Sequence, residues 1–134
     1  EWELANSLTE AGKPERALRH YRRAAEAQPG VYRYANRLAF NLVQSRKYDE
    51  GFEAFVRCHL LRPSESDMVN NIGNVYMARG EANLAIRAYK MAQRMDPSSV
   101  DNAYNMGVLQ LRTPGLQTEG LSSLLRARRL DPTD

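Results

Sequence analysis

The sequence predicts an all-α fold made of four helix hairpins in succession. Residues 66–97 place apolar side chains three and four residues apart in two runs, which is typical of one face of a helix. Gly80 interrupts the two runs, and a glycine can take the left-handed conformation that ends a helix. Pro97 ends the second run, because proline lacks the backbone N–H that another helical turn would use. This stretch therefore predicts one hairpin.

The same pattern recurs along the chain with a fixed period. Prolines close each hairpin with spacings of 34, 34 and 35 residues, at Pro29, Pro63, Pro97 and Pro132. Small residues stand twelve positions before them, at Ala17, Gly51, Ala85 and Gly120. Large apolar residues stand eight positions before them, at Tyr21, Phe55, Tyr89 and Leu124. A fixed period with small and large residues in register indicates a stacked array, in which small residues let helices approach closely.

These residues resemble the tetratricopeptide repeat family, whose period is 34. The third repeat carries the most matches, at Gly73, Tyr76, Ala85, Tyr89, Ala92 and Pro97. The resemblance extends over essentially the whole chain. It implies a right-handed superhelix, or α-solenoid, of antiparallel helix hairpins.

The helices are expected in pairs along the chain. The first repeat carries helices over residues 1–11 and 14–27, where Pro14 is tolerated in the first turn. The next two repeats carry helices over 31–45 and 48–61, and over 66–79 and 82–95. The fourth carries one helix that runs from Ser98 or Ser99 to residue 112 and a second helix over 118–130. Either serine can cap the first of these two helices. The fourth repeat departs from the pattern through Gln110, Gly120 and one inserted residue in its turn.

We expect a single domain over residues 1–134, made of four repeats. The approximate limits of the repeats are 1–29 (partial), 30–63, 64–97 and 98–132. Because the first repeat lacks its opening residues, we expect the chain to be an excerpt of a longer protein. The sequence indicates no compartment.

Several function classes are disfavoured by the sequence. The net charge is +3, but acidic residues are interspersed among the arginines and no Gly-rich phosphate loop is present, which disfavours a nucleic-acid partner. No apolar run is long enough to form a membrane helix, so we expect no membrane insertion. The single cysteine, Cys58, occupies a small-residue core position, and His20 and His59 lack partners at metal-ligand spacing. We therefore expect no catalytic site, no metal and no cofactor.

The resemblance implies that the first helices of the repeats line a groove for an extended peptide or protein segment. The residues expected on this face are Trp2, Asn6, Arg33, Asn36, Arg37, Phe40, Asn70, Asn71, Asn74, Met77, Tyr104 and Asn105. An asparagine amide offers both a donor and an acceptor to a peptide backbone. The aromatic residues Trp2, Phe40 and Tyr104 could supply apolar anchor pockets.

The expected function is a non-catalytic protein-interaction scaffold, with two alternatives left open. One is the recognition region of a larger enzyme whose catalytic domain lies elsewhere. The other is a module that self-associates through exposed ends of the array. Chaperone C-terminal tails are disfavoured as partners, because the lysines of the family's carboxylate clamp are missing and Asp67 or Asp101 would repel a carboxylate.

Overall fold

The computed structural model describes residues 1–133, and within this range every regular element is an α-helix. The helices are α1 (Trp2–Glu10), α2 (Pro14–Ala27), α3 (Tyr32–Gln44), α4 (Tyr48–Leu61), α5 (Ser66–Ala78), α6 (Ala82–Met95), α7 (Val100–Arg112) and α8 (Gln117–Leu130). The predicted limits of α2, α4 and α6 agree with these bounds, and the other predicted limits differ by one or two residues. Ser99 is the cap of α7, because its side chain accepts a hydrogen bond from the backbone N–H of Asn102 at 3.2 Å.

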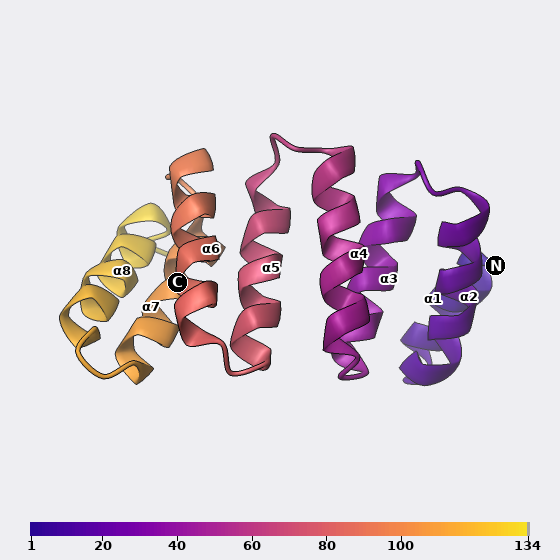
Figure 1. Ribbon diagram of the computed structural model, residues 1–134, viewed down its shortest axis with the longest axis horizontal. Coiled ribbons are helices and arrows are strands. Elements are labelled where there is room, and N and C mark those ends of the chain that lie inside the picture. The colour runs from indigo at the N-terminus through magenta and orange to yellow at the C-terminus, as the bar shows by residue number, and fades with distance from the viewer. Residues whose placement is uncertain (134) are drawn as a thin grey trace. The chain divides into compact units, whose positions relative to one another are not determined.

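Contacts between residues divide the chain into two compact units. Unit 1 comprises Glu1–Pro63 and holds α1 to α4, and unit 2 begins at Ser64 and holds α5 to α8. Within each unit, consecutive helices pack against one another and run in opposite directions (Figure 1). Each unit therefore consists of two antiparallel hairpins.

Each turn inside a hairpin contains one residue with a positive φ angle. Gly12, Gly80 and Gly115 have φ angles of 74°, 79° and 85°, in the left-handed region that glycine adopts without a steric penalty. Arg46 stands at the equivalent place in the second hairpin and has a φ of 61°. The turn geometry is thus kept even where glycine is absent.

The small residues predicted at helix contacts lie where two helices touch. Ala17 and Ala85 are fully buried. A Cβ added to Gly51 would lie 2.7 Å from Cγ2 of Val43, closer than side-chain carbons approach. One added to Gly73 would lie 2.6 Å from the ring of Tyr89, so the large residue does fill the gap beside the small one.

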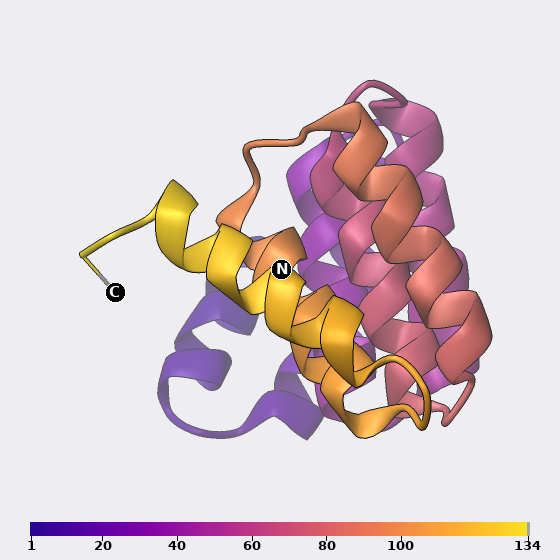
Figure 2. The same ribbon diagram turned by 90° about the vertical axis from the view of Figure 1, so that its left-hand side faces the viewer.

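The fourth hairpin shows the physical reason for its unusual sequence. A Cβ on Gly120 would lie 2.6 Å from the backbone N of Leu111 and 3.0 Å from the backbone O of Gly107. Helices α7 and α8, seen side by side in Figure 2, therefore touch backbone to backbone at this crossing. Gln110 is buried beside them, and its Oε1 accepts a hydrogen bond from the Ser123 hydroxyl at 2.7 Å.

Candidate functional site

Five residues expected on the binding face of unit 1 line one depression. Its volume is about 270 Å³, and its walls are Trp2 of α1 together with Arg33, Asn36, Arg37 and Phe40 of α3. The four residues of α3 stand at positions i, i+3, i+4 and i+7, so they share one face of that helix. We refer to this depression as the α1–α3 pocket.

The walls of the α1–α3 pocket combine aromatic rings with positive charge. The guanidinium carbon of Arg33 lies 5.6 Å from the centroid of the Trp2 ring and 5.4 Å from that of Tyr34. This distance is within the range of a cation–π contact. Phe40 is exposed, and its ring meets that of Phe55 edge to face at 5.8 Å. Asn36 has its Oδ1 buried without a hydrogen-bond donor.

Asn6, the remaining predicted residue of unit 1, is held by its own hairpin. The Tyr21 hydroxyl donates to Asn6 Oδ1 at 2.7 Å. In unit 2 the equivalent pair is repeated, because the Tyr89 hydroxyl donates to Asn74 Oδ1 at 2.5 Å. Burial raises the pKa of Tyr89 well above its ordinary value, so its hydroxyl remains a donor. Each asparagine thus ties the two helices of its hairpin together through its Oδ1, and its amide nitrogen remains for other contacts.

Asn70 lies in the interior of unit 2. Its side chain is 7% exposed, and its Oδ1 accepts a hydrogen bond from Nδ2 of Asn102 at 3.3 Å. Asn102 also donates to the backbone O of Tyr89 at 3.0 Å. A ligand would have to displace this contact to reach the Asn70 carbonyl oxygen.

The other predicted residues of unit 2 are accessible. Asn71, Met77 and Asn105 are half-buried, and Tyr104 is exposed. Within residues 1–133 the amides of Asn71 and Asn105 make no side-chain hydrogen bond, so both can donate and accept. Tyr104 also lines an opening of about 460 Å³ between α7 and α8.

Two residues with a structural role at this face were not predicted to be part of it. Tyr34 packs its ring on Trp2, with centroids 4.8 Å apart, and Asn102 bonds to Asn70. Trp2 and Asn70 stand at equivalent repeat positions, and so do Tyr34 and Asn102, since the members of each pair are separated by two repeat periods. The repeat period was the signal that could have identified both.

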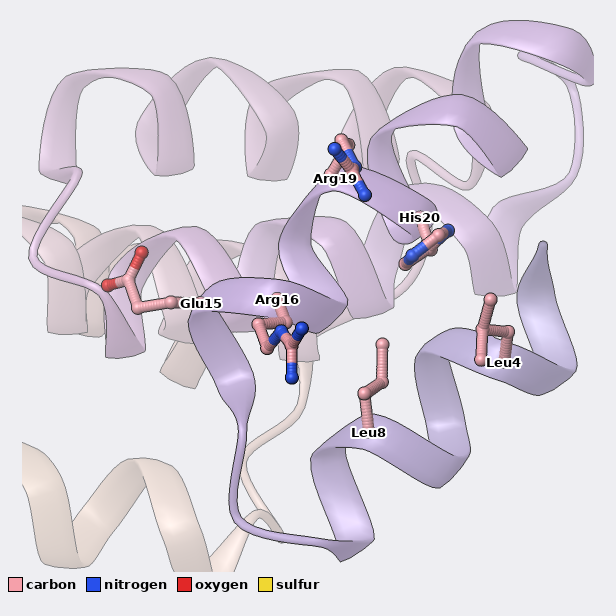
Figure 3. A pocket seen from close by; sticks show the side chains of 6 residues that line it. All are labelled: Leu4, Leu8, Glu15, Arg16, Arg19 and His20. Carbon is pink, nitrogen blue, oxygen red and sulfur yellow. The ribbon is translucent and has the colours of Figure 1, made fainter.

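A larger pocket of unit 1 lies away from the predicted face. Its volume is about 540 Å³, and Figure 3 shows Leu4 and Leu8 of α1 beside Arg16, Arg19 and His20 of α2. The His20 ring contacts the Glu1 carboxylate at 2.6 Å, and this hydrogen bond lowers the pKa of Glu1. None of the predicted site residues lines this pocket.

Reactive groups in the described part of the chain are few and separate. The Cys58 thiol is buried, and burial raises its pKa to about 11, which keeps it protonated rather than nucleophilic at neutral pH. Across residues 1–133, no three His, Cys, Asp or Glu side chains gather in a way that could hold a metal ion. None of the helices described is long and apolar enough to cross a membrane.

Comparisons with known proteins agree with this architecture. The "Tetratricopeptide repeat protein 8" of Caenorhabditis elegans is 23% identical over 111 residues, which are 81% of this chain and 22% of that protein. The chain thus spans about a fifth of the length of this curated relative.

Solved structures show the same fold. A MamA structure from Desulfovibrio magneticus RS-1 matches 99% of this chain and 75% of its own, with a TM-score of 0.85 and 14% identity. YrrB, described as "a TPR protein with an unusual peptide-binding site", matches 98% of this chain and 67% of its own, with a TM-score of 0.72 and 21% identity. The predicted all-α solenoid class is thereby confirmed. A family model described as "Tetratricopeptide repeat" also matches residues 3–57 and 70–134. With its repeats, its hairpins and this match in agreement, the chain belongs to the tetratricopeptide repeat family.

Proposed function

We propose that this chain is a non-catalytic interaction module that binds an extended segment of a partner protein on the first-helix faces of its hairpins. The faces are those of α1 and α3 in unit 1 and of α5 and α7 in unit 2. The observation that carries the proposal is the α1–α3 pocket, in which five residues from two helices meet around one depression. The accessible amides of Asn71 and Asn105 support it, because they can pair with a peptide backbone without selecting its side chains.

A double variant tests the proposal in unit 2. Asn71→Ala with Asn105→Ala removes two neutral hydrogen bonds to a bound segment, each contributing about 0.5–1.5 kcal/mol. We expect affinity to fall roughly ten- to hundredfold, since about 1.4 kcal/mol corresponds to a factor of ten. Folding stability should be nearly unchanged, because neither amide holds a neighbouring helix.

The measurement is a pull-down from the parent cell extract, followed by calorimetry on the protein recovered. The control is Arg22→Ala with Arg23→Ala on α2, where Arg22 pairs with Glu50 and Arg23 with Glu1 at exposed positions. Exposed pairs of this kind contribute little to stability. Binding that depends on Arg22 and Arg23 but not on Asn71 and Asn105 would place the interface on the second helices and contradict the proposal.

Self-association is a second candidate, favoured by two exposed leucines. Leu4 is 50% exposed, whereas its repeat counterparts Leu38 and Met106 are 6% and 4% exposed and Ile72 is half-buried. Leu121 is 55% exposed, whereas its counterparts Leu18 and Ile86 are 5% and 7% exposed and Phe52 is half-buried.

Charge is compatible with a contact between these faces. Helix α1 carries acidic residues and no Lys or Arg, whereas α8 ends in Arg126, Arg128 and Arg129. An α1 of one copy on an α8 of another would be a head-to-tail contact. Sedimentation over a wide concentration range, with Leu121→Lys as the control, would detect it. A strictly monomeric species at millimolar concentration would rule it out.

A further inference from the structure

The α1–α3 pocket has a chemical character that the other first-helix positions lack. Of its five lining residues, two are arginines, two are aromatic and one is an amide, and none is acidic. The positions two repeats after Arg33 and Arg37 hold Asp101 and Asn105 in unit 2. Positive charge on the first-helix face is therefore concentrated in unit 1.

Both arginines of the pocket are available to a ligand. Arg33 and Arg37 are exposed, and neither pairs with a carboxylate among residues 1–133. Arg33 lies within cation–π distance of the Trp2 ring, which keeps its guanidinium at the pocket wall. A planar guanidinium with five N–H donors matches a carboxylate better than any other side chain does.

The remaining groups fit the parts of a peptide that surround an acidic side chain. Asn36 lines the pocket, and its Nδ2, which makes no hydrogen bond within residues 1–133, can donate to a peptide C=O. Trp2 and Phe40 offer apolar surface to a neighbouring side chain. Phosphate also attracts arginine, but acidic residues are interspersed among the basic residues of this chain, which disfavours a nucleic-acid partner. The distribution of charge therefore favours a peptide over a nucleic acid.

We infer that the α1–α3 pocket selects an acidic side chain, Asp or Glu, next to an apolar one in an extended partner segment. This inference rests on the proposed function and adds the chemistry of the segment. Arg33 and Arg37 hold the carboxylate, the Asn36 Nδ2 donates to a backbone C=O, and Trp2 and Phe40 contact the apolar neighbour.

The test begins with a library of random heptapeptides displayed on phage and selected on the intact chain. We expect the recovered peptides to be enriched in an acidic residue beside an apolar one. The peptide recovered most often is then synthesised together with an analogue in which Gln replaces the acidic residue. Trp2 is the single tryptophan of the chain, so its fluorescence reports directly on occupation of the pocket.

Two double variants with the same loss of charge separate a specific role from a general one. Arg33→Gln with Arg37→Gln should weaken binding of the acidic peptide at least tenfold, because charge-assisted hydrogen bonds are lost. It should leave binding of the Gln analogue within about twofold. Arg19→Gln with Arg57→Gln, two exposed positions of unit 1 outside the α1–α3 pocket, should change neither affinity.

The outcomes distinguish this inference from the proposed function. Peptides recovered without acidic enrichment, or bound equally by the Arg33 and Arg37 variant, would overturn the inference while the peptide-binding function stands. Recovery of no peptide above background would contradict both. A single-stranded oligothymidine that quenches Trp2 more strongly than any peptide, in a manner dependent on Arg37, would assign the pocket to nucleic acid and overturn the inference.

Discussion

Units 1 and 2 use the same repeat positions to join one first helix to the next, but they use different chemistry. In unit 1 the ring of Trp2 packs on Tyr34 and meets Tyr21 edge to face, with centroids 4.8 Å and 5.5 Å apart. In unit 2 the equivalent contact is a pair of buried amides, Asn70 and Asn102. The aromatic contact leaves the rings of Trp2 and Tyr34 half-buried and close to a pocket, whereas the amide contact is hidden. One backbone arrangement can therefore either leave aromatic rings partly accessible or conceal polar groups.

The largest expected effect comes from breaking the amide contact of unit 2. Asn102→Ala removes the donor to Asn70 Oδ1 and to the Tyr89 carbonyl, and a buried polar atom without a partner costs about 1–3 kcal/mol. We expect the free energy of unfolding to fall by about 2–4 kcal/mol. Urea melts followed by circular dichroism measure it. Asn105→Ala on the same helix is the matched control and should change stability by less than about 0.5 kcal/mol.

An intermediate effect should be common to both units, because both hairpins are equally tight at one position. Ala17 and Ala85 are each fully buried, so a leucine at either position overpacks the hairpin. We expect Ala17→Leu and Ala85→Leu each to destabilise by about 1–3 kcal/mol. The loss of stability is measured by comparing the urea midpoint of each variant with that of the parent protein. A midpoint equal to that of the parent for either variant would mean that the hairpin register is wrong there.

The smallest of the three effects should come from the aromatic contact of unit 1. Tyr34→Ala removes a ring pair with Trp2 and a cation–π contact with Arg33, at a half-buried position. We expect a loss of about 1–2 kcal/mol. Urea melts followed by the fluorescence of Trp2 report it, and Tyr34→Phe should retain most of the stability. A larger loss than for Asn102→Ala would reverse the comparison of the two units.

Much of the fold was predictable because the determining residues are local. Spacings of three and four residues fix helical faces, and Gly80 and Pro97 stand where the helices of their hairpin end. The reason for Gly120 was not predictable in this way. It follows from the close crossing of α7 and α8, which depends on the positions of Gly107 and Leu111 in the other helix.

The site was predictable as a face but not as a set of contacts. Asn70 and Asn71 are adjacent, yet consecutive helical side chains point about 100° apart, so one is buried and the other accessible. The sequence around Asn102 favours a capping or solvated residue, although its side chain is 2% exposed. Its partner Asn70 is 32 residues away, and only the stacking of helices brings the two amides together.

Arg46, which adopts the left-handed backbone conformation in the turn of the second hairpin, also affects the unfolded chain. Holding Arg46 at a φ of 61° costs roughly 1–2 kcal/mol in the folded state compared with glycine. An arginine also has fewer backbone conformations to lose than a glycine, which returns about 0.4–1 kcal/mol through the entropy of the unfolded ensemble. The second term offsets part of the first, so Arg46→Gly should stabilise the protein by about 0–1.6 kcal/mol. A turn that is strained when folded can therefore persist in a repeat, because the same residue restricts the chain before it folds.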